Sequence, residues 1–183
     1  MLQRIRALAL EAGFYQAEYL DIAGVKFYPE VRDCCRENAC RGYQRSWACP
    51  PAVGTVDECR ERMGKFRHML LFSQKYDLED SFDFDGMMAG MSDFKRLVDD
   101  LHRRIVPCCR DFLLLSNEGC DRCSICTYPS APCRFPEMLH HSLEGYGLMV
   151  YELANQAGIR YNNGPNTVTY FGALCFNEPI EKG

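Results

Sequence analysis

Residues 68–76, His68-Met69-Leu70-Leu71-Phe72-Ser73-Gln74-Lys75-Tyr76, contain the apolar run that decides the fold class. A short apolar run of this kind is typical of a strand buried inside a sheet. Such a strand needs helices or a second sheet to cover its faces. The segments on either side of residues 68–76 therefore determine which architecture the chain can form.

Helical patterns lie on both sides of this strand. Thr55-Val56-Asp57-Glu58 is a capping-box pattern, which predicts a helix that begins there. Apolar residues at helical spacing predict two more helices, over 2–12 and 94–105. Pro136 is well placed as the first residue of another helix, which the apolar pattern carries to Gly158.

Further strands are predicted over 17–27, 112–115 and 167–176, and a surface loop is predicted over the acidic stretch 77–85. The resulting order of strands and helices predicts an α+β fold, with helices packed on a small mixed sheet and two cysteine-rich metal-binding loops. A length of 183 residues suits a single domain over 1–183.

Composition and charge exclude several classes of protein. The net charge is −4 with both signs mixed along the chain, so we expect no nucleic-acid partner. No apolar stretch approaches the roughly 20 residues of a membrane helix, and the N-terminal residues lack the apolar region of a secretory signal. We therefore expect a cytoplasmic protein. Its twelve cysteines are then better explained as reduced, metal-binding thiols than as a disulfide framework.

The strongest motif is Cys120-x2-Cys123-x2-Cys126-x6-Cys133. Two successive two-residue gaps gather three thiolates in one tight loop, as in the related ferredoxin pattern, and a fourth follows further along the chain. Structural zinc sites more often use two C-x2-C pairs separated by a longer loop. The motif predicts an iron–sulfur cluster of the [4Fe–4S] type, with zinc as the alternative.

A looser motif precedes it, Cys35-x4-Cys40-x8-Cys49-Pro50-Pro51. Its three thiolates form a second site or lend ligands to the first. A cluster held by three cysteines leaves one iron open to water or substrate. Cys34 is the candidate for a fourth ligand here, and a zinc loop that only orders the backbone is the alternative.

The other candidates for chemistry are weaker. His140 and His141, at the expected start of the helix after the second motif, are predicted to be exposed or capping, and Glu144 to be a surface charge. The chain contains no dinucleotide fingerprint and no phosphate-binding loop. Four cysteines have apolar surroundings and are predicted to be structural: Cys59, Cys108, Cys109 and Cys175.

The combined motifs resemble a bacterial and archaeal family of unknown function whose members are labelled predicted metal-binding proteins. The resemblance spans most of the chain and is carried by the two cysteine motifs, by Ser142-x-Glu144-x-Tyr146-Gly147 and by the Gly164-Pro165 turn. It implies metal binding in anaerobic organisms through seven cysteines: Cys35, Cys40, Cys49, Cys120, Cys123, Cys126 and Cys133. It implies no established reaction.

Three functions remain open on these grounds. The first is an iron–sulfur protein that passes electrons to or from a redox partner protein. The second is an enzyme that uses the open iron of a three-cysteine cluster. The third is a zinc-stabilised interaction module without a redox role.

Overall fold

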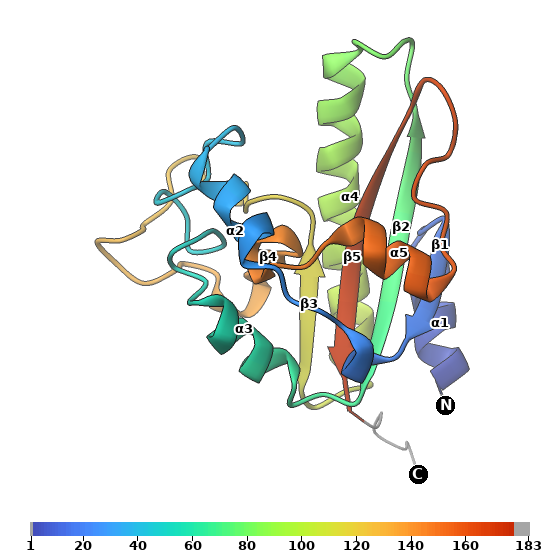
Figure 1. The fold of residues 1–183 in the computed structure, drawn as a ribbon, viewed down its shortest axis with the longest axis horizontal. Coiled ribbons are helices and arrows are strands. Elements are labelled where there is room, and N and C mark those ends of the chain that lie inside the picture. The colour runs from blue at the N-terminus through green and yellow to red at the C-terminus, as the bar shows by residue number, and fades with distance from the viewer. Residues whose placement is uncertain (1, 178–183) are drawn as a thin grey trace.

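The computed structural model describes residues 2–177, which form an α+β fold on one five-stranded mixed sheet (Figure 1). The strands lie in the order β1-β2-β5-β3-β4. Their bounds are β1 Gln16–Leu20, β2 His68–Asp77, β3 Phe112–Ser116, β4 His141–Ser142 and β5 Thr167–Phe176. Neighbouring strands are antiparallel, except that β4 runs parallel to the end of β3. The predicted fold class is confirmed.

The long strands β2 and β5 pair in register from His68 opposite Phe176 to Asp77 opposite Thr167. Successive side chains of a strand point to opposite faces. Leu70 and Phe72 therefore enter one hydrophobic core, while Met69 and Leu71 enter the other. Residues 69–72 are all fully buried, because helices cover both faces of the sheet.

Five helices belong to the described residues: α1 Leu2–Glu11, α2 Pro29–Arg36, α3 Val56–Met63, α4 Phe84–Ile105 and α5 Val150–Ala157. Helices α1 and α4 share one core with the sheet, and α3 and α5 share the other. In Figure 1, α5 crosses the near face of the sheet and α4 lies behind it. None of the helices in the described part of the chain is long and apolar enough to span a membrane.

Most of the predicted elements are present, with different ends. The capping box of α3 is formed, since the Thr55 hydroxyl accepts the Glu58 N–H and the Glu58 carboxylate accepts the Thr55 N–H. Helix α4 begins at Phe84, inside the stretch predicted as an acidic loop, because the Asp83 side chain caps the N–H of Gly86. The predicted strand over 17–27 ends at Leu20.

One predicted helix is wrong. Instead of a helix from Pro136 to Gly158, the chain forms a 3-10 turn at Pro136–Met138, then β4, a second turn at Glu144–Tyr146, and only then α5. Gly147 adopts a left-handed φ of 76°, which ends the second turn. The Ser142 hydroxyl accepts the N–H of Gly145 at 2.9 Å, so side-chain bonding competes with the helix here.

The segments that contain the cysteine motifs extend from the β4 edge of the sheet (Figure 1). Residues 37–55 connect α2 to α3, and residues 117–135 follow β3. We call them the first loop and the second loop. They come together although about 70 residues of chain separate them, counted from Cys49 to Cys120.

Candidate metal centre

The first loop follows a helix that the sequence analysis missed. Cys35 lies in the last turn of α2, which begins with Pro29 at its first position, the signal that predicts such a start. After it the backbone turns sharply, with left-handed φ angles at Asn38, Arg41 and Gln44. The Asn38 side chain accepts the N–H of Tyr43 at 3.0 Å. These turns bring Cys40 back toward Cys49.

Two glycines enclose the sulfur of Cys49. A Cβ atom added to Gly42 of the first loop would lie 2.7 Å from Cys49 Sγ and 3.7 Å from Cys40 Sγ. A Cβ atom added to Gly119 of the second loop would lie 2.9 Å from the same Cys49 sulfur. The thiol of Cys49 therefore lies where the two loops meet, beside the residue that precedes Cys120. Sequence reasoning missed both glycines, although each lies within two residues of a motif cysteine.

Burial and neighbouring thiols affect the ionisation of Cys49 and Cys35. Burial raises the pKa of Cys49 to about 11, and the neighbouring Cys40, Cys35 and Cys120 raise it further. Burial also raises the pKa of Cys35, while the Arg32 guanidinium opposes this effect. Cys49 and Cys35 are therefore neutral thiols at pH 7, and a bound metal would have to displace their protons.

The Arg32 guanidinium of α2 lowers the pKa of Cys35, and it also interacts with the buried Cys59 thiol. It donates one hydrogen bond to the carbonyl of Gly54. Its Nε and Nη1 atoms are buried and have no hydrogen-bond partner among the described residues. Buried donors usually have partners, so this guanidinium is suited to a negatively charged group that joins the thiols.

Both loops supply hydrogen-bond donors to the sulfurs of the second loop. Burial opposes ionisation of Cys126, but the N–H groups of Tyr128, Trp47 and Thr127 and the Ser46 hydroxyl together lower its pKa. The N–H of Phe135 donates to Cys133 Sγ at 3.4 Å. Donors of this kind stabilise a thiolate over a thiol.

Trp47 joins the two loops directly. Its indole Nε1 donates to the carbonyl of Ala131 at 3.0 Å, and its ring meets the ring of Tyr128 edge-on, with centroids 5.0 Å apart. The Ser46 hydroxyl interacts with both Cys49 and Cys126. Residues between the motif cysteines therefore hold the two loops together.

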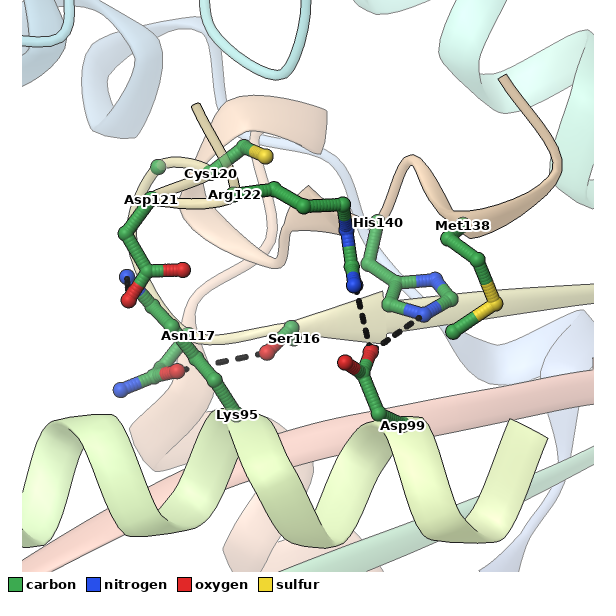
Figure 2. Close-up of a pocket in the computed structure, with 10 residues that line it drawn as sticks. Lys95, Asp99, Ser116, Asn117, Cys120, Asp121, Arg122, Met138 and His140 are labelled. Atoms are coloured by element: carbon green, nitrogen blue, oxygen red, sulfur yellow. Dashed lines mark hydrogen bonds and ion pairs between the residues drawn. The ribbon is translucent and has the colours of Figure 1, made fainter. Parts of the chain in front are cut away.

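A second set of contacts ties the second loop to α4. Asp99 of α4 accepts a hydrogen bond from Arg122 at 2.6 Å and lies 3.5 Å from His140 Nε2 (Figure 2). Lys95, one turn earlier, pairs with Asp121 at 3.4 Å. Burial opposes ionisation of Asp99, yet His140 and Arg122 outweigh it and lower its pKa to about 2. Two ion pairs, Asp99–Arg122 and Lys95–Asp121, thus join α4 to the start of the second loop.

The structural settings of two histidines differ from those predicted from the sequence. His140 and His141 open no helix: the side chain of His140 is 9% exposed and faces Asp99, while His141 belongs to β4 and packs on Tyr146. Burial, with a contribution from Arg62, lowers the pKa of His141 to about 4. Glu144 is exposed, as predicted.

The cysteines outside the motifs lie where the sequence predicted. All twelve cysteines are free thiols. Cys59 and Cys175 belong to the core under α3 and α5, and Cys108 and Cys109 belong to the core under α1 and α4. The Cys34 thiol, the candidate for a fourth ligand, is exposed and donates to the Glu30 carbonyl of its own helix.

Comparison with known proteins gave one match. A family model described as "Predicted metal-binding protein (DUF2284)" matches residues 18–176. The chain belongs to this family. Neither the comparison with curated proteins nor that with solved structures gave a match. The suspected relationship is confirmed, and the description of the family agrees with the general expectation of metal binding.

All seven motif cysteines lie inside the part of the chain that this metal-binding family covers, whereas α1 lies outside it. Among residues 2–177, no three Cys, His, Asp or Glu side chains converge as ligands of a single ion. The donors that the two loops gather are thiols, which suit zinc and iron–sulfur clusters. The glycines beside Cys49 and the unpartnered donors of Arg32 fit such a group.

Proposed function

We propose that this protein binds iron–sulfur clusters, of the [4Fe–4S] type, through the seven motif cysteines and passes electrons to a partner protein. One observation carries the proposal: two loops distant in sequence meet at Cys49, whose sulfur lies between Gly42 and Gly119. Several thiols come from two loops, and glycines rather than larger residues lie beside them. This arrangement suits a bound metal cluster better than a disulfide.

The surroundings of the sulfurs favour iron–sulfur over zinc. Hydrogen bonds to cysteine sulfurs and limited solvent access are the means by which proteins tune cluster potentials. The two loops together supply such donors to Cys126 and Cys133. When bound, an iron–sulfur cluster supplies one-electron exchange at a potential set by its surroundings.

The chain's own residues have distinct tasks in this proposal. The Arg32 guanidinium offsets negative charge beside Cys35. Trp47 and Tyr128 cover the junction of the loops and limit the access of water. Arg122 and Asp121 fasten the second loop to α4, so that its cysteines keep their positions when the charge of the site changes.

We further propose that the chain acts as a single domain in the cytoplasm, where a reducing environment keeps thiols free. No reaction at a substrate is part of this proposal. The redox partner is a protein that exchanges single electrons, since a cluster of this kind transfers one electron at a time.

Anaerobic purification tests the proposal. We expect iron and acid-labile sulfide in equal amounts, with visible absorption that bleaches on reduction by dithionite. The Cys34→Ser variant is the matched control, because this exposed cysteine adjoins Cys35 but bonds to its own helix. A colourless protein that contains zinc and no sulfide would refute the iron–sulfur assignment, and one without any metal would refute metal binding.

A further inference from the structure

We propose that an open cleft between α3 and the first half of β3 binds an organic acid, whose carboxylate pairs with Arg62 and whose apolar body lies along the strand. The cleft has a volume of about 830 Å³, and α4 and residues 136–141 supply its other walls (Figure 1). Volumes of this size are typical of small-molecule sites. None of the seven motif cysteines lines the cleft, so the site does not depend on the proposed metal binding.

The short length of β4 creates the cleft. Strand β4 pairs with β3 only at Leu115 and Ser116. Residues 112–114 pair with β5 on one side, and no other described strand covers their opposite edge. Apolar side chains line the space that is left: Val53, Phe66, Val106, Phe112, Leu114 and Leu139. A lining of this kind suits a ligand with a hydrocarbon body better than an inorganic ion.

The charges of the cleft differ between its rim and its interior. The rim carries both signs, because Lys65, Arg110, Asp111 and Glu137 are all exposed there. Arg62, which is partly buried, is the charged side chain of the interior. It forms no ion pair with a carboxylate among residues 2–177. The interior therefore holds a positive charge that the described chain leaves without a counter-ion.

Neutral groups hold Arg62 in place. Its Nη1 donates to the Tyr146 hydroxyl at 2.7 Å, and its Nη2 donates to the Val53 carbonyl at 3.1 Å. The guanidinium carbon also lies 5.5 Å from the centre of the Tyr146 ring. A guanidinium has five N–H donors, so these two bonds leave three for a ligand. A carboxylate is the partner that matches this planar group and its charge.

The opposite wall has hydrogen-bonding capacity that the described chain does not use. The rings of His102 and His140 line it, with centroids 5.2 Å apart. The Nδ1 atom of His102 is buried and has no hydrogen-bond partner among residues 2–177, although buried polar atoms usually have one. His140 also lines a narrower pocket that contains Cys120 (Figure 2). A ligand in the cleft would therefore be separated from the second loop by one side chain.

Calorimetric titration of the anaerobically purified protein tests the site with three probes. Phenylacetate has a carboxylate on an apolar body, phenylacetamide has the same shape without the charge, and sulfate has charge without an apolar body. We expect phenylacetate to bind, phenylacetamide to bind at least about tenfold more weakly, and sulfate to give no heat of binding.

Variants locate the binding. Arg62→Gln should weaken phenylacetate by at least about tenfold. Arg60→Gln is the matched control, since Arg60 belongs to the same helix but pairs with Asp57 and does not line the cleft. Val106→Glu keeps Arg62 and its partners, and the side chain it replaces is 53% exposed, so the fold should tolerate it. Its negative charge at the cleft should also weaken phenylacetate. Far-ultraviolet circular dichroism confirms folding of each variant.

Four results would overturn the proposal. The first is equal affinity for phenylacetate and phenylacetamide, which would show that the charge has no part. The second is a sulfate affinity that matches that of phenylacetate, which would make this a site for inorganic anions. The third is unchanged binding in both Arg62→Gln and Val106→Glu. The fourth is no binding of any probe at millimolar concentration. A protein that binds phenylacetate but contains no metal would support this site and refute the proposed function.

Discussion

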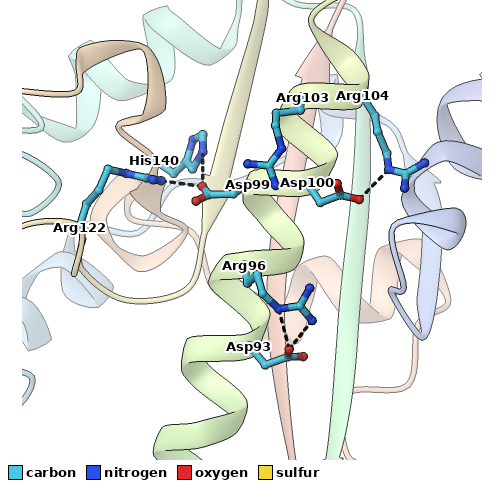
Figure 3. Close-up of polar contacts among 8 residues, drawn as sticks. All are labelled: Asp93, Arg96, Asp99, Asp100, Arg103, Arg104, Arg122 and His140. Carbon is cyan, nitrogen blue, oxygen red and sulfur yellow. Dashed lines mark hydrogen bonds and ion pairs between the residues drawn. The ribbon is translucent and has the colours of Figure 1, made fainter.

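Replacement of Asp99 by asparagine should destabilise the protein by about 2 kcal/mol at neutral pH. Asp99 and Arg122 are only 21% and 27% exposed, and their bond joins α4 to the second loop (Figure 3). A carboxyl group whose pKa falls from its ordinary value of 3.8 to about 2 gains roughly 2.5 kcal/mol on folding. The amide cannot replace this, because it leaves the Arg122 charge without its counter-ion.

The dependence on pH has a definite sign. Because the pKa of Asp99 is lower in the folded protein than in the unfolded chain, its stabilisation is fully present above about pH 4. It is lost as the pH falls toward 2 and the folded-state carboxyl takes up a proton. The difference between wild type and Asp99→Asn should therefore shrink across this interval.

Urea unfolding of anaerobically prepared protein measures the effect, with Asp100→Asn as the matched control. Asp100 pairs with Arg104 on the same helix (Figure 3), but both side chains are more exposed, so its loss should cost under about 1 kcal/mol. The coupling of Asp99 to Arg122 would be wrong if Asp99→Asn lowered the free energy of unfolding no more than Asp100→Asn. It would also be wrong if the losses caused by Asp99→Asn and Arg122→Gln were fully additive in the double variant.

Three other variants test the loops and the cysteines. Gly42→Ala should impair metal loading, because its added Cβ would lie 2.7 Å from Cys49 Sγ. Gly24→Ala is the control and should load normally, because no atom lies within 4 Å of a Cβ added there. Metal analysis of both variants decides this. Trp47→Phe should release metal to a chelator several-fold faster, since it removes the bond to Ala131, and an unchanged rate would contradict that role. Cys59→Ser should keep its full metal content and lose about 1–2 kcal/mol in thermal unfolding, since its thiol is buried; loss of metal would show that it belongs to the site.

The sequence predicted the sheet better than the segments around the site. Residues 69–72 and 171–176 are buried because both faces of the sheet are covered there, and their apolar pattern identified β2 and β5. Apolar periodicity failed after Pro136, because Leu139, Leu143 and Tyr146 keep helical spacing while Gly145 and Gly147 permit turns. Local backbone chemistry outweighed the hydrophobic pattern there.

For the candidate site, spacing identified the cysteines but not their neighbours. The contact of Gly119 with Cys49 and that of Trp47 with Ala131 depend on how two distant loops approach each other. No local pattern contains that information. The same holds for Asp99, which is an ordinary helix-surface residue by sequence and acquires its partner only when α4 lies beside the second loop.

The strand order also determines when the protein can assemble during synthesis. Strand β5 joins β2 to β3 in the sheet, yet it is the last strand in residues 2–177. All seven motif cysteines therefore leave the ribosome before β3 has its main partner. Until residues 167–176 are made, nothing in the sheet fixes the second loop beside the first. If the two loops share a metal as proposed, it should consequently enter only after β5 has been made.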